Sequence, residues 1–156
     1  MLMLSLIHIS HENLGWGKIF LPQLEMYTMG CWITIPASIA EKFEKEPFND
    51  ALVGISSVLG NIAPVFLMCS ANDLHILYQV RSPFTKEPTI FLYDNYQGGI
   101  GFAEKIYRSM EELLKMAYEH IQNCPCDKGC PSCVGASWNK NIKRDALTIL
   151  KQMIKT

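Results

Sequence analysis

Four cysteines within ten residues constrain this chain more than any other feature of its sequence. They are spaced C-x-C-x3-C-x2-C, at Cys124, Cys126, Cys130 and Cys133. A loop of this length can turn back and place four thiolates around one point, as tetrahedral Zn2+ requires. Gly129 permits the tight bend. Pro125 and Pro131 stiffen the loop before metal binds, which lowers the entropy lost on binding.

The redox state of these cysteines depends on the compartment. The apolar start, residues 1–9, lacks the basic residues and the cleavage site of a signal peptide and is too short to cross a bilayer. We therefore expect a cytoplasmic protein, in which thiols stay reduced. Closely spaced reduced cysteines favour a metal site over disulfides. Two disulfides, four free thiols and an iron–sulfur cluster are the alternatives. Four thiolates would fill every position around zinc, so the expected site is structural rather than catalytic.

Charge is unevenly distributed along the chain, although the formal net charge is only −1. Residues 1–123 carry eight Lys or Arg and thirteen Asp or Glu, whereas residues 124–156 carry six and two. Such asymmetry favours contact between the C-terminal part and an anionic partner. The candidate DNA-binding residues are Lys128, Lys140, Lys143 and Arg144. Two other interpretations stay open: a solvated helix face, and cations that offset the net −2 of a zinc–thiolate site.

Hydrophobic periodicity predicts an α+β fold in one domain of 156 residues. It divides into a strand-rich part over 1–47, an α/β core over 48–123, and a zinc loop with a basic helix over 124–156. Strands are expected at Leu2–Ile9, Gly17–Leu24, Cys31–Ile35, Leu74–Val80 and Thr89–Tyr93. Helices are expected at Ser38–Lys45, Ala51–Met68, Phe102–Ile121 and Lys140–Ile154, the last amphipathic.

The helix expected over residues 51–68 is apolar enough to predict a buried core element. Asn49 or Asp50 is a plausible N-cap for it. Gly54, Gly60 and Pro64 interrupt the apolar run, so we expect a break near Gly60 and do not interpret the segment as membrane-spanning.

A glycine-rich turn follows the last expected strand. Its residues are Asp94, Gly98, Gly99 and Gly101. Glycines at a helix start can bind phosphate, but this turn lacks the Gly-Lys-Ser/Thr ending of a P-loop and the spacing of a dinucleotide fingerprint. We favour a structural turn that Asp94 braces.

The rest of the chain offers no catalytic constellation. The four histidines are scattered, and His120 is interpreted as a helix-end residue rather than a ligand. Cys31 and Cys69 lie in apolar surroundings and are interpreted as small hydrophobic residues. No catalytic residue and no ATP-binding motif is predicted.

Several of these segments together resemble a known family. Tyr93–Gly101, the helix after it and Cys124–Val134 resemble the MrfA-type zinc-binding domain, which lies at the C-terminus of a group of DEAD/DEAH-box ATP-dependent DNA helicases. Leu67–Leu74, and Gly15-Trp16-Gly17 together with Thr28 to Pro36, are also similar to it. The resemblance covers most of the chain.

The resemblance implies one structural zinc on the four cysteines and a host helicase with a role in DNA repair. It implies that the domain packs on the motor domains, in the same chain or another, and helps to shape the path of single-stranded DNA. Both motor domains are absent from this sequence, so no enzymatic activity is expected of the chain alone. No membrane or small-molecule partner is expected. The alternatives are a protein–protein scaffold that docks on a separate motor, and an iron–sulfur or redox protein.

Overall fold

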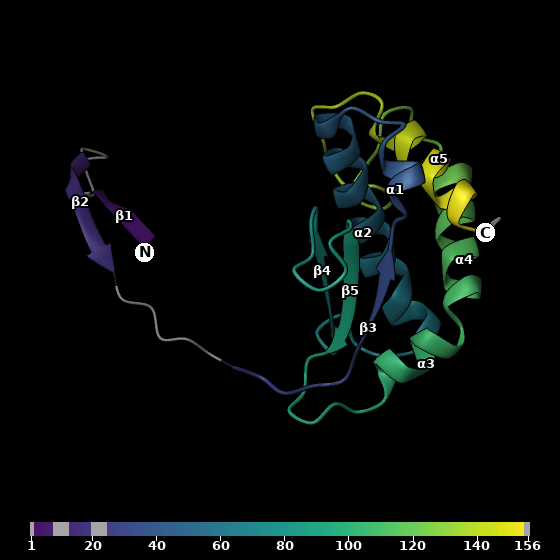
Figure 1. Ribbon diagram of the computed structural model, residues 1–156, viewed down its shortest axis with the longest axis horizontal. Helices are drawn as coiled ribbons and strands as arrows, with labels where there is room; N and C mark the ends of the chain where they lie inside the picture. The colour runs from purple at the N-terminus through teal and green to yellow at the C-terminus, as the bar shows by residue number, and fades with distance from the viewer. Residues whose placement is uncertain (1, 8–12, 20–24, 155–156) are drawn as a thin grey trace.

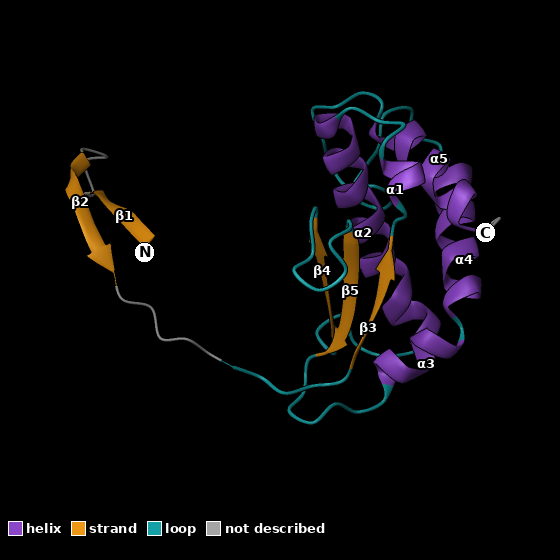
Figure 2. Ribbon diagram, in the orientation of Figure 1, coloured by secondary structure: helices purple, strands orange, loops and turns teal. Residues whose placement is uncertain are grey.

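The computed structural model describes residues 2–7, 13–19 and 25–154, and the described part is mixed α+β, as predicted (Figures 1 and 2). The strands are β1 (Leu2–Ile7), β2 (Asn13–Ile19), β3 (Gly30–Thr34), β4 (Leu74–Gln79) and β5 (Thr89–Asp94). The helices are α1 (Ala37–Ala40), α2 (Lys45–Leu67), α3 (Phe102–Arg108), α4 (Met110–Asn123) and α5 (Ile142–Ile154).

The strands form two antiparallel sheets. Strands β1 and β2 pair with each other, and β3, β5 and β4 form a second sheet with β5 in the centre. On the buried face of this second sheet, Leu92 of β5 lies between Cys31 of β3 and Ile76 of β4. Leu92 is fully buried and Cys31 nearly so. The sheet therefore offers one apolar face for helices to cover.

Helix α2 covers that face and forms the centre of the core. It packs against β4 on one side and against α4 and α5 on the other (Figure 1). Its buried apolar residues include Leu52, Ile55, Val58, Leu59 and Ile62. By length and composition α2 could cross a membrane, but 56% of its most apolar stretch is buried inside the domain. Its hydrophobicity is thus explained by the core that it forms.

The bounds of α2 correct two predictions. The helix begins at Lys45 with Glu44 as the N-cap residue, so Asn49 and Asp50 lie inside it and the predicted caps were wrong. Pro47 allows this early start because the first turn of a helix needs no N–H donors. The predicted break at Gly60 was also wrong, since α2 runs without interruption to Leu67.

The long helix expected over residues 102–121 is two helices. Ser109, with φ −119° and ψ 25°, separates α3 from α4. Helix α3 packs against β3 and β5, whereas α4 packs against α2 and α5. One straight helix could not follow both surfaces, and a pattern of apolar spacings does not reveal the change of direction.

Three smaller differences concern the bounds of short elements. Helix α1 has four residues and ends at Ala40, well before the predicted end at Lys45. Strand β2 begins at Asn13, four residues before the predicted start, and the expected residues 20–24 lie outside the described part. Residues 8 and 9 of the first expected strand also lie outside it.

The turn after β5 is braced by Asp94, as predicted. Its buried carboxylate accepts hydrogen bonds from the backbone N–H groups of Ile100 (2.7 Å), Gly101 (2.8 Å) and Ala103 (2.7 Å). Gly98, Gly99 and Gly101 all have positive φ, and a Cβ on Gly99 would lie 2.7 Å from the Cβ of Met29. The amides that a phosphate would need are therefore occupied by a side chain of the same chain.

Replacing Asp94 should destabilise the domain strongly. Asp94→Ala leaves three backbone donors without their charged acceptor, so we expect a loss of at least about 3 kcal/mol in the free energy of unfolding. Urea denaturation with zinc present measures this loss. The matched control is Glu112→Ala on the exposed side of α4, which should change stability by less than about 0.5 kcal/mol. Equal stability of the two variants would contradict the bracing role.

Candidate metal centre

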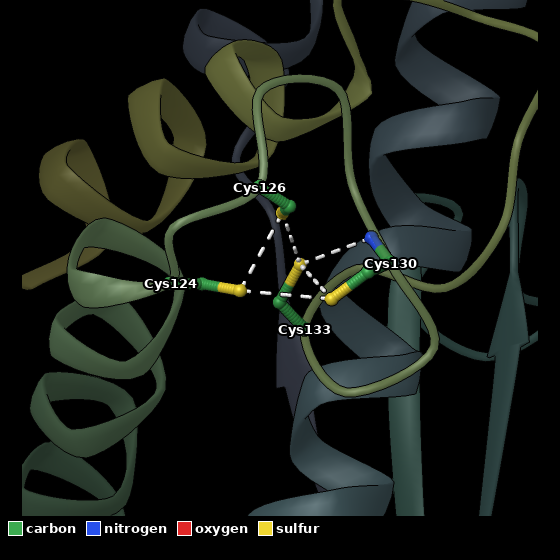
Figure 3. Close-up of side chains that lie close together, drawn as sticks. All are labelled: Cys124, Cys126, Cys130 and Cys133. Atoms are coloured by element: carbon green, nitrogen blue, oxygen red, sulfur yellow. Dashed lines mark hydrogen bonds between the residues drawn. The ribbon is translucent and has the colours of Figure 1, made fainter.

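The four predicted cysteines bring their sulfur atoms together in one cluster (Figure 3). Sγ of Cys124 lies 3.4 Å from that of Cys126 and 3.6 Å from that of Cys130. Sγ of Cys133 lies 3.4 Å from that of Cys126 and 3.6 Å from that of Cys130. All four sulfurs lie within 4.8 Å of one another.

These distances fit a single tetrahedral zinc. Zinc–sulfur bonds of about 2.3 Å place the sulfurs of a regular tetrahedron about 3.8 Å apart. A disulfide needs about 2.05 Å between sulfurs, and the cysteines are not paired in this way. In an iron–sulfur cluster the four cysteines are shared among two or more iron atoms, so their sulfurs do not all surround one point. The donor set therefore fits one metal ion, with all four positions around zinc filled by thiolate.

The second half of the cysteine loop forms a tight backbone turn. The carbonyl of Cys130 accepts from the N–H groups of Cys133 (3.0 Å) and Gly135 (2.9 Å), and the N–H of Cys130 points at Sγ of Cys133 at 3.3 Å. Gly129 has φ +115°, and a Cβ there would lie 2.7 Å from a methyl group of Val134. The bend that Gly129 was expected to permit is thus present, and no larger residue fits it.

Three helices hold the loop through its carbonyl groups. From α2, the amide of Asn61 donates to the carbonyls of Pro131 (3.0 Å) and Ser132 (3.1 Å). From α4, Nε2 of His120 contacts the Ser132 carbonyl at 2.8 Å. A carbonyl can only accept, so this ring nitrogen carries the proton. His120 is a helix-end residue, as predicted.

The third helix, α5, reaches the loop through Lys143. Its ammonium donates to the carbonyls of Cys124 (2.7 Å) and Cys126 (2.6 Å). This contact favours the interpretation that Lys143 offsets the negative charge of the site. Lys128, Lys140 and Arg144 are exposed, and Arg144 also contacts Asp145. DNA contact by these basic residues stays a prediction.

The metal-free thiols do not hold their protons equally. Hydrogen bonds from Cys124 and Cys133 lower the pKa of Cys130 to about 7. Desolvation and the hydrogen bond with Cys133 raise the pKa of Cys126 to about 12. The thiolate of Cys130 therefore forms easily, whereas Cys126 needs the positive charge of a metal ion to release its proton.

The two remaining cysteines lie away from the cluster. Cys31 is buried in β3, and burial raises its pKa to about 11. Cys69, just after α2, is half-buried, and desolvation also raises its pKa. A raised pKa keeps both thiols protonated and unreactive at neutral pH.

The fold and the cluster together define a zinc-binding domain with a closed, four-thiolate site. The model of the MrfA Zn-binding domain family matches residues 55–134, about half of the chain, and ends one residue after Cys133. The chain belongs to this family, as its sequence motifs suggested.

Its relatives include helicases much longer than this chain. The "Uncharacterized ATP-dependent helicase YprA" of Bacillus subtilis is 41% identical over 143 residues, which are 91% of this chain and 19% of that protein. The solved structure of the DUF1998 helicase MrfA bound to DNA matches with a TM-score of 0.87 and 39% identity, over 97% of this chain and 20% of that one. The chain thus spans about a fifth of the length of these helicases.

One relative is shorter. The "Uncharacterized protein MJ1572.1" of Methanocaldococcus jannaschii is 44% identical over an alignment of 79 residues that covers 47% of this chain and 70% of that protein. That relative is therefore itself a shorter chain than this one.

Removing one thiolate should release the metal. Cys130→Ser is expected to lower the zinc content from about one ion per chain to near zero and to lower the melting temperature, because metal binding and local folding are coupled. Elemental analysis and thermal melting measure the two effects. Cys69→Ser is the matched control and should retain its zinc. Full zinc content in Cys130→Ser, or iron in place of zinc in the unmodified chain, would contradict a four-cysteine zinc site.

Two lysines three residues apart allow the role of the Lys143 contact to be tested separately from the role of surface charge. Lys143→Met leaves the carbonyls of Cys124 and Cys126 without their charged donor, so zinc should dissociate more than about tenfold faster. Lys140→Met should release zinc at the rate of the unmodified protein. Transfer of zinc to a chromogenic chelator measures both rates, and equal rates would show that the Lys143 contact does not support the site.

Proposed function

We propose that this chain is a structural zinc module of an ATP-dependent DNA helicase and contacts the DNA on which the motor acts. The observation that carries the proposal is the closed cysteine cluster, which α2, α4 and α5 hold through Asn61, His120 and Lys143. The zinc would join three helices into one surface and would not take part in chemistry.

Complete coordination by cysteine argues against a catalytic metal. A catalytic zinc keeps one position open for water or substrate, and here four sulfurs fill all four positions. Asp94 beside the glycine-rich turn is not available for catalysis either, because its carboxylate already accepts three backbone hydrogen bonds. We therefore propose that the chain has no enzymatic activity of its own and that ATP hydrolysis belongs to its motor partner.

Contact with DNA is supported by the charge around the zinc loop. Lys128 in the loop, Lys140 just before α5 and Arg144 in its first turn all expose their side chains to solvent. Cations on one surface attract the phosphate backbone and release its counterions. The solved structure of MrfA, 39% identical to this chain, contains bound DNA.

The setting of the module is part of the proposal. We infer a motor in the same chain or in another, a role of the assembled helicase in DNA repair, and a location in the cytoplasm. Relatives that are ATP-dependent helicases support the first point. A reducing compartment suits four thiols that must bind metal rather than oxidise.

A second candidate function is that of a protein scaffold. It is supported by a surface away from the zinc loop. The strand β3 and the helix α3 border a cavity of about 460 Å³ lined by residues that include Met29, Trp32 and Tyr107. Trp32 is 59% exposed and Tyr107 72% exposed. Exposed aromatic residues around a hollow are typical of protein contacts. In this function the domain would bind a motor and leave DNA untouched.

Charge reversal on the zinc-loop surface should weaken DNA binding. The variant carries Lys128→Glu, Lys140→Glu and Arg144→Glu and leaves Lys143 in place, because that lysine supports the zinc loop. We expect at least tenfold weaker binding of single-stranded DNA and a shallower dependence of affinity on salt concentration. Fluorescence anisotropy of a labelled oligonucleotide at several salt concentrations measures both.

A control variant distinguishes the loss of a local DNA contact from the change in the net charge of the protein. Lys105→Glu, Arg108→Glu and Lys42→Glu change the charge by the same amount on α3 and near α1, and should reduce affinity much less. The zinc content of both variants should equal that of the unmodified chain. Zinc binding without any measurable DNA affinity would contradict the DNA contact and support the scaffold.

A further inference from the structure

Trp138 is the most exposed large hydrophobic side chain in the described part of the molecule. It lies in the segment between the cysteine loop and α5, and its relative exposure is 103%. A tryptophan ring in water costs free energy because its large apolar surface stays hydrated. A ring at full exposure is available for a partner to cover.

The backbone on both sides of Trp138 is held in place. The hydroxyl of Ser137 accepts from the N–H of Asn139 at 3.1 Å, and Oδ1 of Asn139 accepts from the N–H of Asn141 at 2.9 Å. The Asn139 amide also donates to Asp50 of α2 at 2.9 Å, which anchors the segment to the core helix. The ring therefore projects from a fixed base, so a partner that stacks on it orders little additional backbone.

The neighbours of Trp138 are polar and basic. Lys140 follows two residues later, and Arg144 lies in the first turn of α5. The backbone of the cysteine-loop tip comes alongside, because a Cβ on Gly129 would lie 3.2 Å from the Gly135 carbonyl and 3.3 Å from Ile142. Lys128, next to Gly129, therefore lies at the same end of the molecule as the segment that holds Trp138.

The acidic groups in this region do not cancel the positive charge. Asp50 is engaged by Asn139, and Asp145 is nearly buried and contacts Arg144. Asp127 is exposed in the cysteine loop. The exposed cations Lys128, Lys140 and Arg144 therefore outnumber the exposed carboxylates of the described residues 124–154.

We propose that Trp138 is a stacking platform for one base of single-stranded nucleic acid, with the flanking cations on the phosphates. This inference rests on the proposed DNA contact. It adds that Trp138 makes the contact with a base and that the ligand is single-stranded. An aromatic ring can stack on a base only where the face of that base is free, so it selects a single strand over a duplex. A protein hot spot would instead place the ring among apolar neighbours, whereas its neighbours along the chain here include Ser137, Asn139 and Lys140.

Fluorescence can observe this ring alone. The chain has three tryptophans, so the double variant Trp16→Phe, Trp32→Phe leaves Trp138 as the only indole. Stacking on a base should quench its emission on addition of an oligothymidine. An oligonucleotide of the same length with abasic sites throughout keeps the phosphates and removes the bases. It should bind through the cations without quenching Trp138.

Affinity gives the second readout. We expect Trp138→Ala to bind oligothymidine about tenfold more weakly than the unmodified chain, and to bind the abasic oligonucleotide equally well. Trp138→Phe keeps an aromatic face and should recover part of the loss. Trp32→Ala removes an exposed tryptophan from β3 and should leave both affinities unchanged. Zinc content and melting temperature check that each variant folds.

The possible failures are distinguishable. If the unmodified chain binds both oligonucleotides equally well and Trp138→Ala does not weaken binding, the stacking inference is wrong and the DNA contact stands. If the unmodified chain binds neither oligonucleotide at low salt, the proposed DNA contact itself is wrong, and the inference falls with it. If Trp138→Ala keeps its DNA affinity but no longer binds helicase motor domains, the ring is a protein contact and the inference is overturned.

Discussion

Burial of α2 is the constraint on which the rest of the structure depends. The sheet lies on one side of this helix, and α4 and α5 lie on the other (Figure 1). Gly54 lets the end of the cysteine loop and the start of α5 pack closely on α2, since a Cβ there would lie 3.1 Å from the Cβ of Val134 and 3.3 Å from Ile142. Asn61, two turns further along α2, reaches the cysteine loop directly. The same helix therefore positions the core and the metal site.

The metal site in turn completes the helical layer. Cys124 directly follows α4, and Cys133 with Val134 is buried against the core before the chain enters α5. A loop that folds back on itself exposes carbonyl groups that cannot pair within the loop. Asn61, His120 and Lys143 supply donors from three helices. Zinc binding and the packing of α4 on α5 should therefore be coupled.

What the sequence predicted well was local. Four sulfurs within ten residues, the apolar strands β4 and β5, and the turn braced by Asp94 all depend on residues close together in the chain. What it missed depends on distant packing. The bond from Asn61 to Pro131 joins residues 70 positions apart, and no local pattern marks Asn61 as a support for the loop. Ser109 divides the long helix because α3 and α4 pack on different surfaces. The predicted caps Asn49 and Asp50 lie inside a helix that in fact begins at Lys45.

The two ends of the domain differ in chemistry, and this difference bears on function. Around β3 and α3, aromatic side chains such as Trp32 and Tyr107 border an apolar hollow. Around the zinc loop, exposed cations lie beside the four-cysteine cluster, and Lys143 donates to two carbonyls of the loop. A zinc–thiolate group would carry a net charge of −2 at this end, and the ammonium of Lys143 beside it would offset part of that charge. With Lys143 committed to the loop, the charge of Lys128, Lys140 and Arg144 remains available to a partner. In the proposed function, the apolar end would contact a motor and the basic end would contact DNA, so the domain would link the two.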